Sequence, residues 1–262
     1  MARSIYIASP NAGTGKSTVA LGLVSCLTKV VAKVGVFRPF VESREGDAFL
    51  TLLLNRAGST TPAEQCVGAT WDEFHADPEE ALARIVDAYR ALAREHDVVI
   101  IDGSDFTDVA GNPELALNAR VAANIGVPVL LVVSGQNDVE DVVASVEVSM
   151  AEIADNHART VAVVANKCHP ENRRSITEAL AAIEGITSTT LPEVPLLAAP
   201  AVHEVLDAVE GTLIAGDETL LDREAESVLV CAMDVSHVLE RLTAGQLAIV
   251  PADRSAMLIS LM

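Results

Sequence analysis

Short, continuously apolar runs alternate along the chain with longer stretches in which apolar residues recur at helical spacing. Runs that are apolar at every position are typical of strands buried on both faces of a sheet. We expect such strands at Ser4–Ala8, Val34–Phe37, Val98–Ile101, Val127–Val133, Thr160–Ala165 and Gly185–Leu191. The helical stretches between them are Ser17–Ala32, Ala48–Ala57, Pro78–His96, Glu114–Gly126, Val139–His157 and Asn172–Glu184. This alternation predicts right-handed crossovers and a doubly wound, mostly parallel α/β sheet.

The pattern changes after the sixth strand, where prolines at positions 192, 195 and 200 interrupt it. A short closing helix is expected over Ala201–Val209. Beyond it come two strand-like and two helical segments, at Ser227–Ala232, Ser236–Thr243, Leu247–Val250 and from Ser255 onward. We therefore predict one domain over residues 1–211 and a second over residues 212–262. The second is small for a stable domain and its last apolar run reaches Met262, so we expect an incomplete small α/β unit.

Composition and charge limit the kind of core and the partners that this chain can have. Only 3% of residues are aromatic and 50% are hydrophobic, so the core must be built from Ala, Val, Leu and Ile, and the chain is not disordered. The net charge of −19 would repel nucleic acid and anionic lipid, so we expect small molecules as partners and neither of those two. The four widely spaced cysteines and the absence of a leader or membrane-length apolar run indicate a cytoplasmic protein.

The strongest chemical signal is SPNAGTGKST over Ser9–Thr18, between a predicted strand and a predicted helix. This context is typical of a phosphate-binding loop, in which backbone N–H groups and a helix N-terminus surround phosphate oxygens. Lys16 is expected to reach the β- and γ-phosphates and Ser17 to ligate Mg²⁺. Pro10 stands where such loops usually have their first glycine, and an ordinary strand–turn–helix corner stays open. The predicted phosphate-binding residues are Asn11, Gly13, Thr14, Gly15, Lys16, Ser17 and Thr18.

Other polar residues follow predicted strands. Asp102 ends the apolar run VVII, which is typical of a carboxylate beside Mg²⁺, although Asp–Gly is also a common turn pair. Arg38 could contact an anionic ligand, and Asp47 is either a metal-site residue or a plain helix cap. Asn166 could contact a nucleotide base, or it could be a turn residue followed by a solvated Lys167. The histidines form no metal pattern and no nucleophile elbow is present, so these residue patterns identify no catalytic group.

In order, the segments AxxNAGTGKS, VGVFRPF, EGDA, VVIIDG and VVANK resemble the dethiobiotin synthetase-like P-loop domain. More specifically, they resemble the N-terminal region of the long form of bacterial phosphate acetyltransferase. In that family a DRTGG domain follows, and the tail from Val230 to Arg254 is similar to its beginning. The resemblance therefore covers essentially the whole chain.

The resemblance implies a P-loop lysine and serine at Lys16 and Ser17, acids near Mg²⁺ at Asp47 and Asp102, and an adenine contact at Asn166. Arg38 stands where true dethiobiotin synthetases have a lysine that handles the carbamate, and a guanidinium does not readily deprotonate. The resemblance also implies a regulatory, Mg-ATP-binding and oligomerising region. Acetyl transfer between CoA and phosphate then belongs to a further domain, with no catalytic residue here.

Two alternatives remain open at this point. One is a self-standing ATP-dependent ligase of the dethiobiotin or cobyrinate type, which requires Mg-ATP turnover at Lys16. The other is a P-loop sensor or scaffold that binds nucleotide without any catalytic partner.

Overall fold

The computed structural model describes residues 2–104 and 114–261. The chain divides into two compact units, Met1–Glu193 and Val194–Met262, and each is described by itself. We call them unit 1 and unit 2. No described helix combines the length and the apolar character that crossing a membrane requires. The units divide at Glu193, and the domain boundary predicted after Gly211 stays a prediction.

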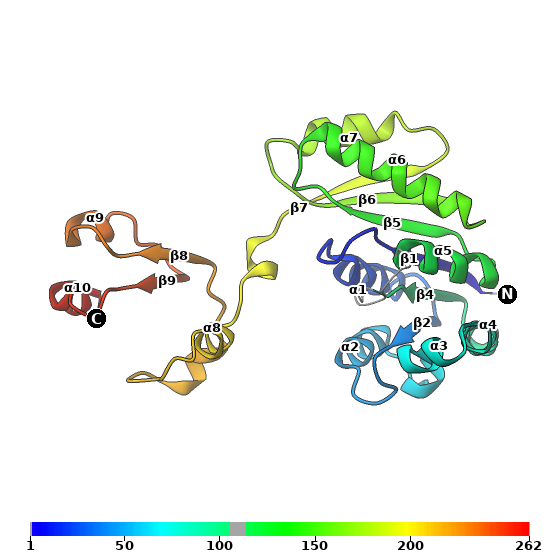
Figure 1. The fold of residues 1–262 in the computed structure, drawn as a ribbon, viewed down its shortest axis with the longest axis horizontal. Helices are drawn as coiled ribbons and strands as arrows, with labels where there is room; N and C mark the ends of the chain where they lie inside the picture. Colours follow the sequence, from blue (N-terminus) through cyan, green and yellow to red (C-terminus); the bar gives the residue numbers. More distant parts are fainter. Residues whose placement is uncertain (1, 105–113, 262) are drawn as a thin grey trace. The chain divides into compact units, whose positions relative to one another are not determined.

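Unit 1 is built on a parallel sheet of seven strands in the order β3-β2-β4-β1-β5-β6-β7 (Figure 1). All six pairings between neighbouring strands are parallel, so the predicted doubly wound α/β sheet is confirmed. The sequence pattern did not predict β3, which has only four residues. The strands are β1 (Arg3–Ala8), β2 (Val34–Val41), β3 (Val67–Thr70), β4 (Val98–Asp102), β5 (Val129–Ser134), β6 (Thr160–Cys168) and β7 (Thr187–Pro192).

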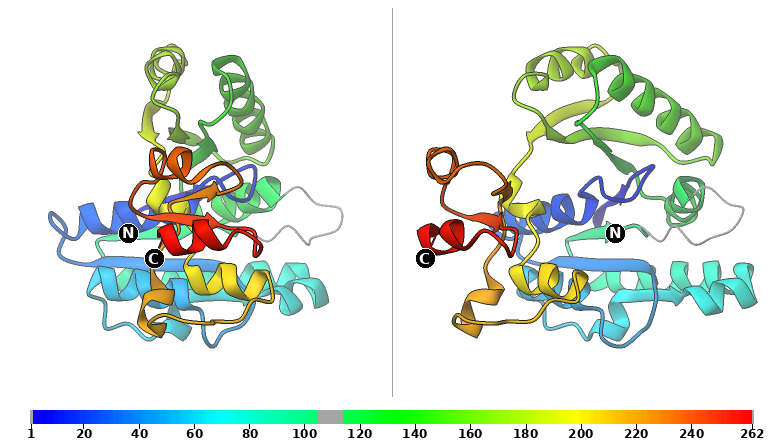
Figure 2. Two further views of the ribbon diagram at one scale, coloured as in Figure 1. Left: turned by 90° about the vertical axis from the view of Figure 1, so that its left-hand side faces the viewer. Right: turned by 60° about the vertical axis from the view of Figure 1, so that its left-hand side comes forward.

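Helices cover both faces of this sheet (Figure 2). Helices α1 and α2 pack against each other, while α4, α5 and α6 contact one another in succession. Right-handed crossovers place the first pair on one face and the second group on the other. The helices are α1 (Lys16–Leu27), α2 (Ala48–Ala57), α3 (Trp71–Ala76), α4 (Pro78–Glu95), α5 (Glu114–Ile125), α6 (Val139–Asp155) and α7 (Arg173–Ala181), with a short 3₁₀ turn η1 (Ala63–Cys66).

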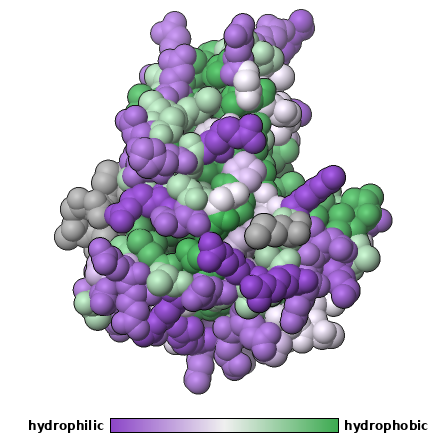
Figure 3. All heavy atoms as spheres, turned by 90° about the vertical axis from the view of Figure 1, so that its right-hand side faces the viewer, coloured by the Kyte–Doolittle hydropathy of each residue, from purple (hydrophilic) through white to green (hydrophobic). Residues whose placement is uncertain are grey.

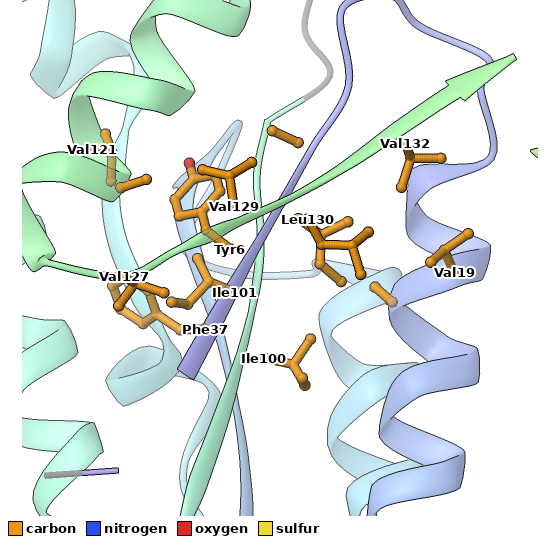
Figure 4. Close-up of a cluster of buried hydrophobic side chains, with 14 of the residues drawn as sticks. Tyr6, Val19, Phe37, Ile100, Ile101, Val121, Val127, Val129, Leu130 and Val132 are labelled. Atoms are coloured by element: carbon orange, nitrogen blue, oxygen red, sulfur yellow. The ribbon is translucent and has the colours of Figure 1, made fainter. Parts of the chain in front are cut away.

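The core lies between the central strands and these helices (Figure 4). Tyr6 of β1, Phe37 of β2 and Ile101 of β4 are fully buried. Most of the remaining core side chains are Val, Leu, Ile and Ala, as the low aromatic content requires. β-Branched side chains pack well on a pleated surface that is covered on both sides, which is why these apolar runs form parallel strands.

Unit 2 is small. Its elements are η2 (Pro195–Ala198), α8 (Val202–Ala208), η3 (Glu218–Asp222), β8 (Ser227–Val230), α9 (Val235–Leu239), β9 (Gln246–Ile249) and α10 (Ser255–Leu261). Strands β8 and β9 pair in parallel. Three buried residues, Cys231, Val238 and Met257, form its core cluster.

Candidate functional site

The candidate site lies where β1, β4 and β2 reach the carboxyl edge of the sheet in unit 1. Because parallel strands all end at one edge, residues far apart in the sequence meet there. The loop after β1 leads into α1, and Asp102 is the last residue of β4. Three predicted site residues, Lys16, Arg38 and Asp102, come together here, and Asp47 joins them from the start of α2.

Two glycines shape the loop. Gly13 and Gly15 have φ angles of 75° and 80°, in the left-handed region that side chains rarely adopt. Gly15 caps the N-terminus of α1, and a Cβ there would lie 2.3 Å from Nδ2 of Asn166. Gly15 therefore needs to be glycine for two reasons, its backbone angle and its neighbour.

Lys16 is buried beneath this loop with 1% of its surface exposed. Its Nζ donates to Oδ1 of Asp102 at 2.6 Å and to the carbonyl oxygen of Gly103 at 2.5 Å. Asp102 is fully buried, so the ion pair compensates two charges that water does not reach. The predicted phosphate-binding amine and the predicted metal-site acid therefore bind each other.

Arg38 extends the ion pair into a network. Its Nε lies 3.4 Å from Oδ2 of Asp102, and its Nη1 donates to Oδ2 of Asp47. Oδ1 of Asp47 accepts a hydrogen bond from the backbone N–H of Leu50 at 2.8 Å, so Asp47 is also the helix cap of α2. Asp47 is therefore the helix cap that the sequence left open, and its role as a metal-site residue stays a prediction. The order along the network is Lys16, Asp102, Arg38, Asp47.

Asn166 and Lys167, at the end of β6, close over the phosphate-binding loop. Nδ2 of Asn166 donates to the carbonyl oxygen of Thr14 at 2.9 Å, and Nζ of Lys167 donates to that of Gly13 at 2.8 Å. Lys167 has a φ of 60°, which is uncommon for a residue with a side chain. Asn166 therefore holds the loop, and its predicted contact with a base stays a prediction.

The other predicted residues line the loop. Thr14 is buried, Ser17 is half-buried in the first turn of α1, and Asn11 and Thr18 are exposed. The backbone carbonyl of Asn11 accepts a hydrogen bond from Oγ of Ser9 at 3.1 Å. Their roles toward phosphate and Mg²⁺ stay predictions.

The sequence did not assign a positioning role to three residues of the site, Lys167, Asn118 and Tyr6. The role of Lys167 could have been predicted, because it directly follows Asn166 at a strand end. Asn118 carried no such signal, because it sits inside the helical pattern of α5. Its Oδ1 accepts hydrogen bonds from the Tyr6 hydroxyl at 2.6 Å and from the backbone N–H of Ser104 at 3.0 Å. Asn118 and Tyr6 thereby hold the backbone at Ser104, two residues after Asp102.

One buried thiol lies at the end of β6. Burial raises the pKa of Cys168, the last residue of β6, and nearby Arg173 lowers it by less. Its Sγ donates to the carbonyl oxygen of Ala165 at 3.3 Å. A buried, protonated thiol of this kind is a packing residue and not a nucleophile.

Across the described ranges 2–104 and 114–261, no group of three or more His, Cys, Asp or Glu side chains is arranged to hold a metal ion by itself. A metal at this site would therefore depend on oxygen atoms that a ligand brings, as Mg²⁺ does with nucleotide phosphates. A glycine-containing loop that leads into a helix N-terminus beside a buried lysine suits binding of a phosphate-bearing ligand.

A strand–loop–helix corner of this geometry on a parallel sheet defines a P-loop α/β protein. The chain belongs to the AAA domain family (AAA_26), whose model matches residues 3–201. The model of the DRTGG domain matches residues 204–262. The resemblance stated from the sequence motifs is thus confirmed for both parts of the chain.

Several curated relatives are named phosphate acetyltransferase. The protein from Nitratidesulfovibrio vulgaris is 26% identical over an alignment of 275 positions, which covers 99% of this chain and 39% of that protein. The protein from Synechocystis sp. is 25% identical over 275 aligned positions, which cover 100% of this chain and 39% of that protein. The protein from Escherichia coli K12 is 22% identical over 290 aligned positions, which cover 99% of this chain and 40% of that protein. The chain thus spans about two fifths of the length of these relatives.

Solved structures share the fold. A plasmid partition protein from Borrelia burgdorferi B31 bound to AMPPNP superposes with a TM-score of 0.53 at 14% identity, covering 84% of this chain and 94% of that chain. Chloroplast FtsY from Physcomitrella patens gives a TM-score of 0.51 at 19% identity, covering 74% of this chain and 59% of that one. At these identities the likeness establishes the fold alone.

Proposed function

We propose that this chain is the N-terminal nucleotide-binding and regulatory region of a phosphate acetyltransferase. The parent enzyme interconverts acetyl-CoA and phosphate with acetyl phosphate and CoA. CoA and acetyl-CoA bind outside this chain, which supplies no residue to acetyl transfer. We further propose that the parent enzyme is cytoplasmic and works as a homo-oligomer.

One observation carries this proposal. The chain aligns over 98% to 100% of its length with the same two fifths of four bacterial phosphate acetyltransferases, and both domain models match in one order. A shared P-loop alone would be weak support, because that fold serves many functions. A P-loop domain followed directly by a DRTGG domain is a much more specific combination.

The residues at the carboxyl edge of unit 1 fit a nucleoside polyphosphate. Gly13 and Gly15 leave the loop backbone open to phosphate oxygens, and Lys16 can exchange Asp102 for a phosphate. Among the described residues, Oδ2 of Asp102 is buried without a hydrogen bond and faces Nε of Arg38 at 3.4 Å, so this carboxylate has an acceptor to offer. Ser17, Asp47 and Asp102 are the residues that would hold Mg²⁺, which would neutralise phosphate charge.

The proposed activity at this site is binding without turnover. A ligase of the dethiobiotin type needs a lysine amine that can lose its proton at the position of Arg38. Arg38 is instead a permanently charged guanidinium engaged by two carboxylates. These contacts support a sensor of nucleotide in preference to an enzyme that consumes it.

Isothermal titration calorimetry of the chain with ATP, with and without Mg²⁺, tests the binding. Replacing Lys16 by Ala should weaken ATP binding at least about tenfold, because a charge-assisted contact to phosphate is lost. Lys29→Ala is the matched control, since Lys29 is exposed near the other end of α1. Equal affinity of wild type and Lys16→Ala would contradict nucleotide binding at this loop.

A second experiment tests the parent activity. The product of the complete reading frame that encodes this chain should form acetyl phosphate from acetyl-CoA and phosphate, and residues 1–262 alone should not. A reading frame that ends at Met262, or a full product without this activity, would overturn the assignment.

One observation favours the ligase alternative. Lys16, Asp47 and Asp102 lie together at one edge of the sheet, as the lysine and acids of an ATP-dependent enzyme would. Release of phosphate from Mg-ATP that depends on a carboxylate or diamine substrate, and is abolished in Lys16→Ala, would establish it. Absence of any ATP hydrolysis would exclude it.

A further inference from the structure

The amino edge of the same sheet carries a second concave surface. A cavity of about 1170 Å³ opens there, formed by the start of β1, the end of α4, the start of β4 and the segment between α5 and β5. We call it the amino-edge cavity. Its volume is slightly above the range of about 300 to 1,000 Å³ that is usual for small-molecule sites. All its lining residues belong to unit 1.

This cavity is separate from the phosphate-binding loop. Arg3 and Ser4 open β1 on the cavity side, whereas the loop begins after Ala8 at the other end of that strand. Six extended residues span roughly 17 Å, so no small ligand reaches both places. A ligand in the amino-edge cavity would not contact Lys16.

Positive charge gathers around the cavity. Arg3, Arg90 and Arg94 line it and all three are exposed. The cavity also contains one acid, Asp97, whose Oδ2 accepts a hydrogen bond from the backbone N–H of Lys33 at 3.2 Å. The chain has only 18 Lys and Arg against 37 Asp and Glu, so three arginines around one hollow run against its overall charge.

These arginines have no side-chain partner among the residues that the structure describes. Four other arginines of unit 1, Arg38, Arg44, Arg84 and Arg174, contact a carboxylate, and two more donate to hydroxyl groups. Asp87 and Glu95, on α4 near these arginines, do not line this cavity, although Arg90 also lines the neighbouring hollow that contains Asp87. The guanidinium groups at the cavity are therefore available to a ligand.

The rest of the cavity wall is largely apolar. Val31, Ala93, Val98, Ile125 and Val127 contribute to it, and Tyr89 donates its hydroxyl hydrogen to Oγ of Ser4 at 2.8 Å. Figure 3 shows the side of unit 1 that carries the N-terminus, where hydrophobic side chains lie between long hydrophilic ones. An apolar surface with a few placed polar groups is the usual composition of a small-molecule site.

We propose that the amino-edge cavity binds a small organic anion, a carboxylate or phosphate group carried on an apolar body. The planar guanidinium groups of Arg90 and Arg94, one helical turn apart, recognise the anionic group by charge-assisted hydrogen bonds. The apolar wall accepts the body of the ligand. This site does not depend on nucleotide binding at Lys16.

Phenyl phosphate, benzoate and benzyl alcohol are suitable probes, because they share one apolar ring and differ in charge. Isothermal titration calorimetry at low ionic strength should show binding of at least one of the two anions and none of benzyl alcohol. A preference for phenyl phosphate would identify a phosphorylated ligand, and a preference for benzoate a carboxylate. Binding of all three alike would overturn the proposal.

Variants locate the binding. Arg90→Gln/Arg94→Gln should lower the affinity for the preferred anion at least about tenfold, which corresponds to one charge-assisted contact. Arg120→Gln is the matched control, because Arg120 is exposed on α5 outside the cavity, and it should bind as wild type does. Lys16→Ala should also bind normally, which separates this site from the phosphate-binding loop.

Three results would contradict the proposal. They are no binding of either anion, equal affinity in the Arg90→Gln/Arg94→Gln variant, or loss of binding in Lys16→Ala alone. Binding of a polyglutamate peptide with no binding of the small anions would also overturn it, in favour of an acidic protein partner. Urea unfolding of the double variant should match wild type and so exclude a folding defect.

Discussion

The two edges of the sheet in unit 1 differ in whether their cationic side chains contact carboxylates. At the carboxyl edge, Lys16 and Arg38 contact the carboxylates of Asp102 and Asp47. At the amino edge, Arg90 and Arg94 have no acidic partner in the part of the chain that the structure describes. The difference follows from burial, since a cation withdrawn from water needs a counter-charge and a solvated one does not.

The largest effect is expected from breaking the buried ion pair. Replacing Asp102 by Leu leaves the Lys16 amine buried without its counter-charge and should lower the free energy of unfolding by about 3 to 5 kcal/mol. Arg94→Gln, at the solvated edge, should change it by less than about 0.5 kcal/mol. Urea unfolding followed by circular dichroism measures both.

A double variant sharpens this result. Lys16→Met/Asp102→Leu replaces both members of the pair by apolar residues and should recover part of the stability that Asp102→Leu loses. If the double variant is as unstable as the sum of the single ones, the two charges do not compensate each other.

A buried thiol of unit 1 tests the effect of burial on a different group. Cys66 directly precedes β3 and is fully buried, and desolvation raises the pKa of its thiol to about 11. The pKa of Cys66 is higher in the folded than in the unfolded chain, so the folded state holds this proton more tightly. The resulting contribution to the free energy of unfolding is complete below pH 9 and is lost as the pH rises through 11. A shift of about two units corresponds to about 2.7 kcal/mol.

The measurement is the free energy of unfolding between pH 8 and 11, a range that spans the ordinary and the raised pKa of this thiol. Cys66→Ala should remove this part of the pH dependence. At pH 8 a thiol reagent should modify exposed Cys26 quickly and leave Cys66 intact. Rapid modification of both would show that the structure around Cys66 opens readily.

Two glycines of the phosphate-binding loop offer a smaller and closely matched comparison. Gly15→Ala imposes a left-handed backbone on a side chain and pushes against Asn166, so it should cost about 2 kcal/mol. Gly13→Ala meets nothing within 4 Å and should cost only the backbone term, about 1 kcal/mol. Equal losses of stability would mean that Asn166 does not hold the loop tightly.

The smallest effect is expected from an ion pair near the surface. Glu73 receives a hydrogen bond from the backbone N–H of Thr70, which lowers its pKa, and contacts with Arg44 and Arg84 lower it further. Glu73→Gln keeps the helix cap but loses the charge, so it should cost less than about 1 kcal/mol. The contribution is present above the unfolded pKa and is lost as the pH falls through the lowered value.

The measurement is again urea unfolding, at neutral and at acidic pH. The stability of wild type and Glu73→Gln should converge as the pH is lowered. A loss comparable to that of Asp102→Leu would contradict the contrast between buried and surface pairs.

Local pattern was sufficient to predict most of this fold. Continuous apolar runs gave the central strands, because a strand buried on both faces has no polar alternation to confuse with a loop. The four residues of β3 were too few to show a period, and the pattern also did not separate α3 from its neighbours. Helix α1 ends at Leu27, five residues before the expected Ala32.

The site was predicted in part. Lys16, Arg38, Asp47 and Asp102 were each singled out from the sequence, and in the structure they lie together at one edge, while their roles toward phosphate and Mg²⁺ stay predictions. The sequence did not reveal that Lys16 binds Asp102, because that pairing joins residues 86 positions apart. The amino-edge cavity is assembled from four separate segments that share no motif, so only the folded chain shows it.

The pair of Lys16 and Asp102 also sets a threshold for any ligand of the loop. Asp102 is a carboxylate tethered beside the amine, and it competes with an incoming anion at the high effective concentration of an intramolecular group. An affinity measured for the loop would therefore reflect how much more strongly the ligand anion binds Lys16 than Asp102 does. A singly charged ligand gains little over Asp102, whereas a polyphosphate that also contacts the loop backbone gains more. Selectivity for highly charged ligands follows from this competition alone.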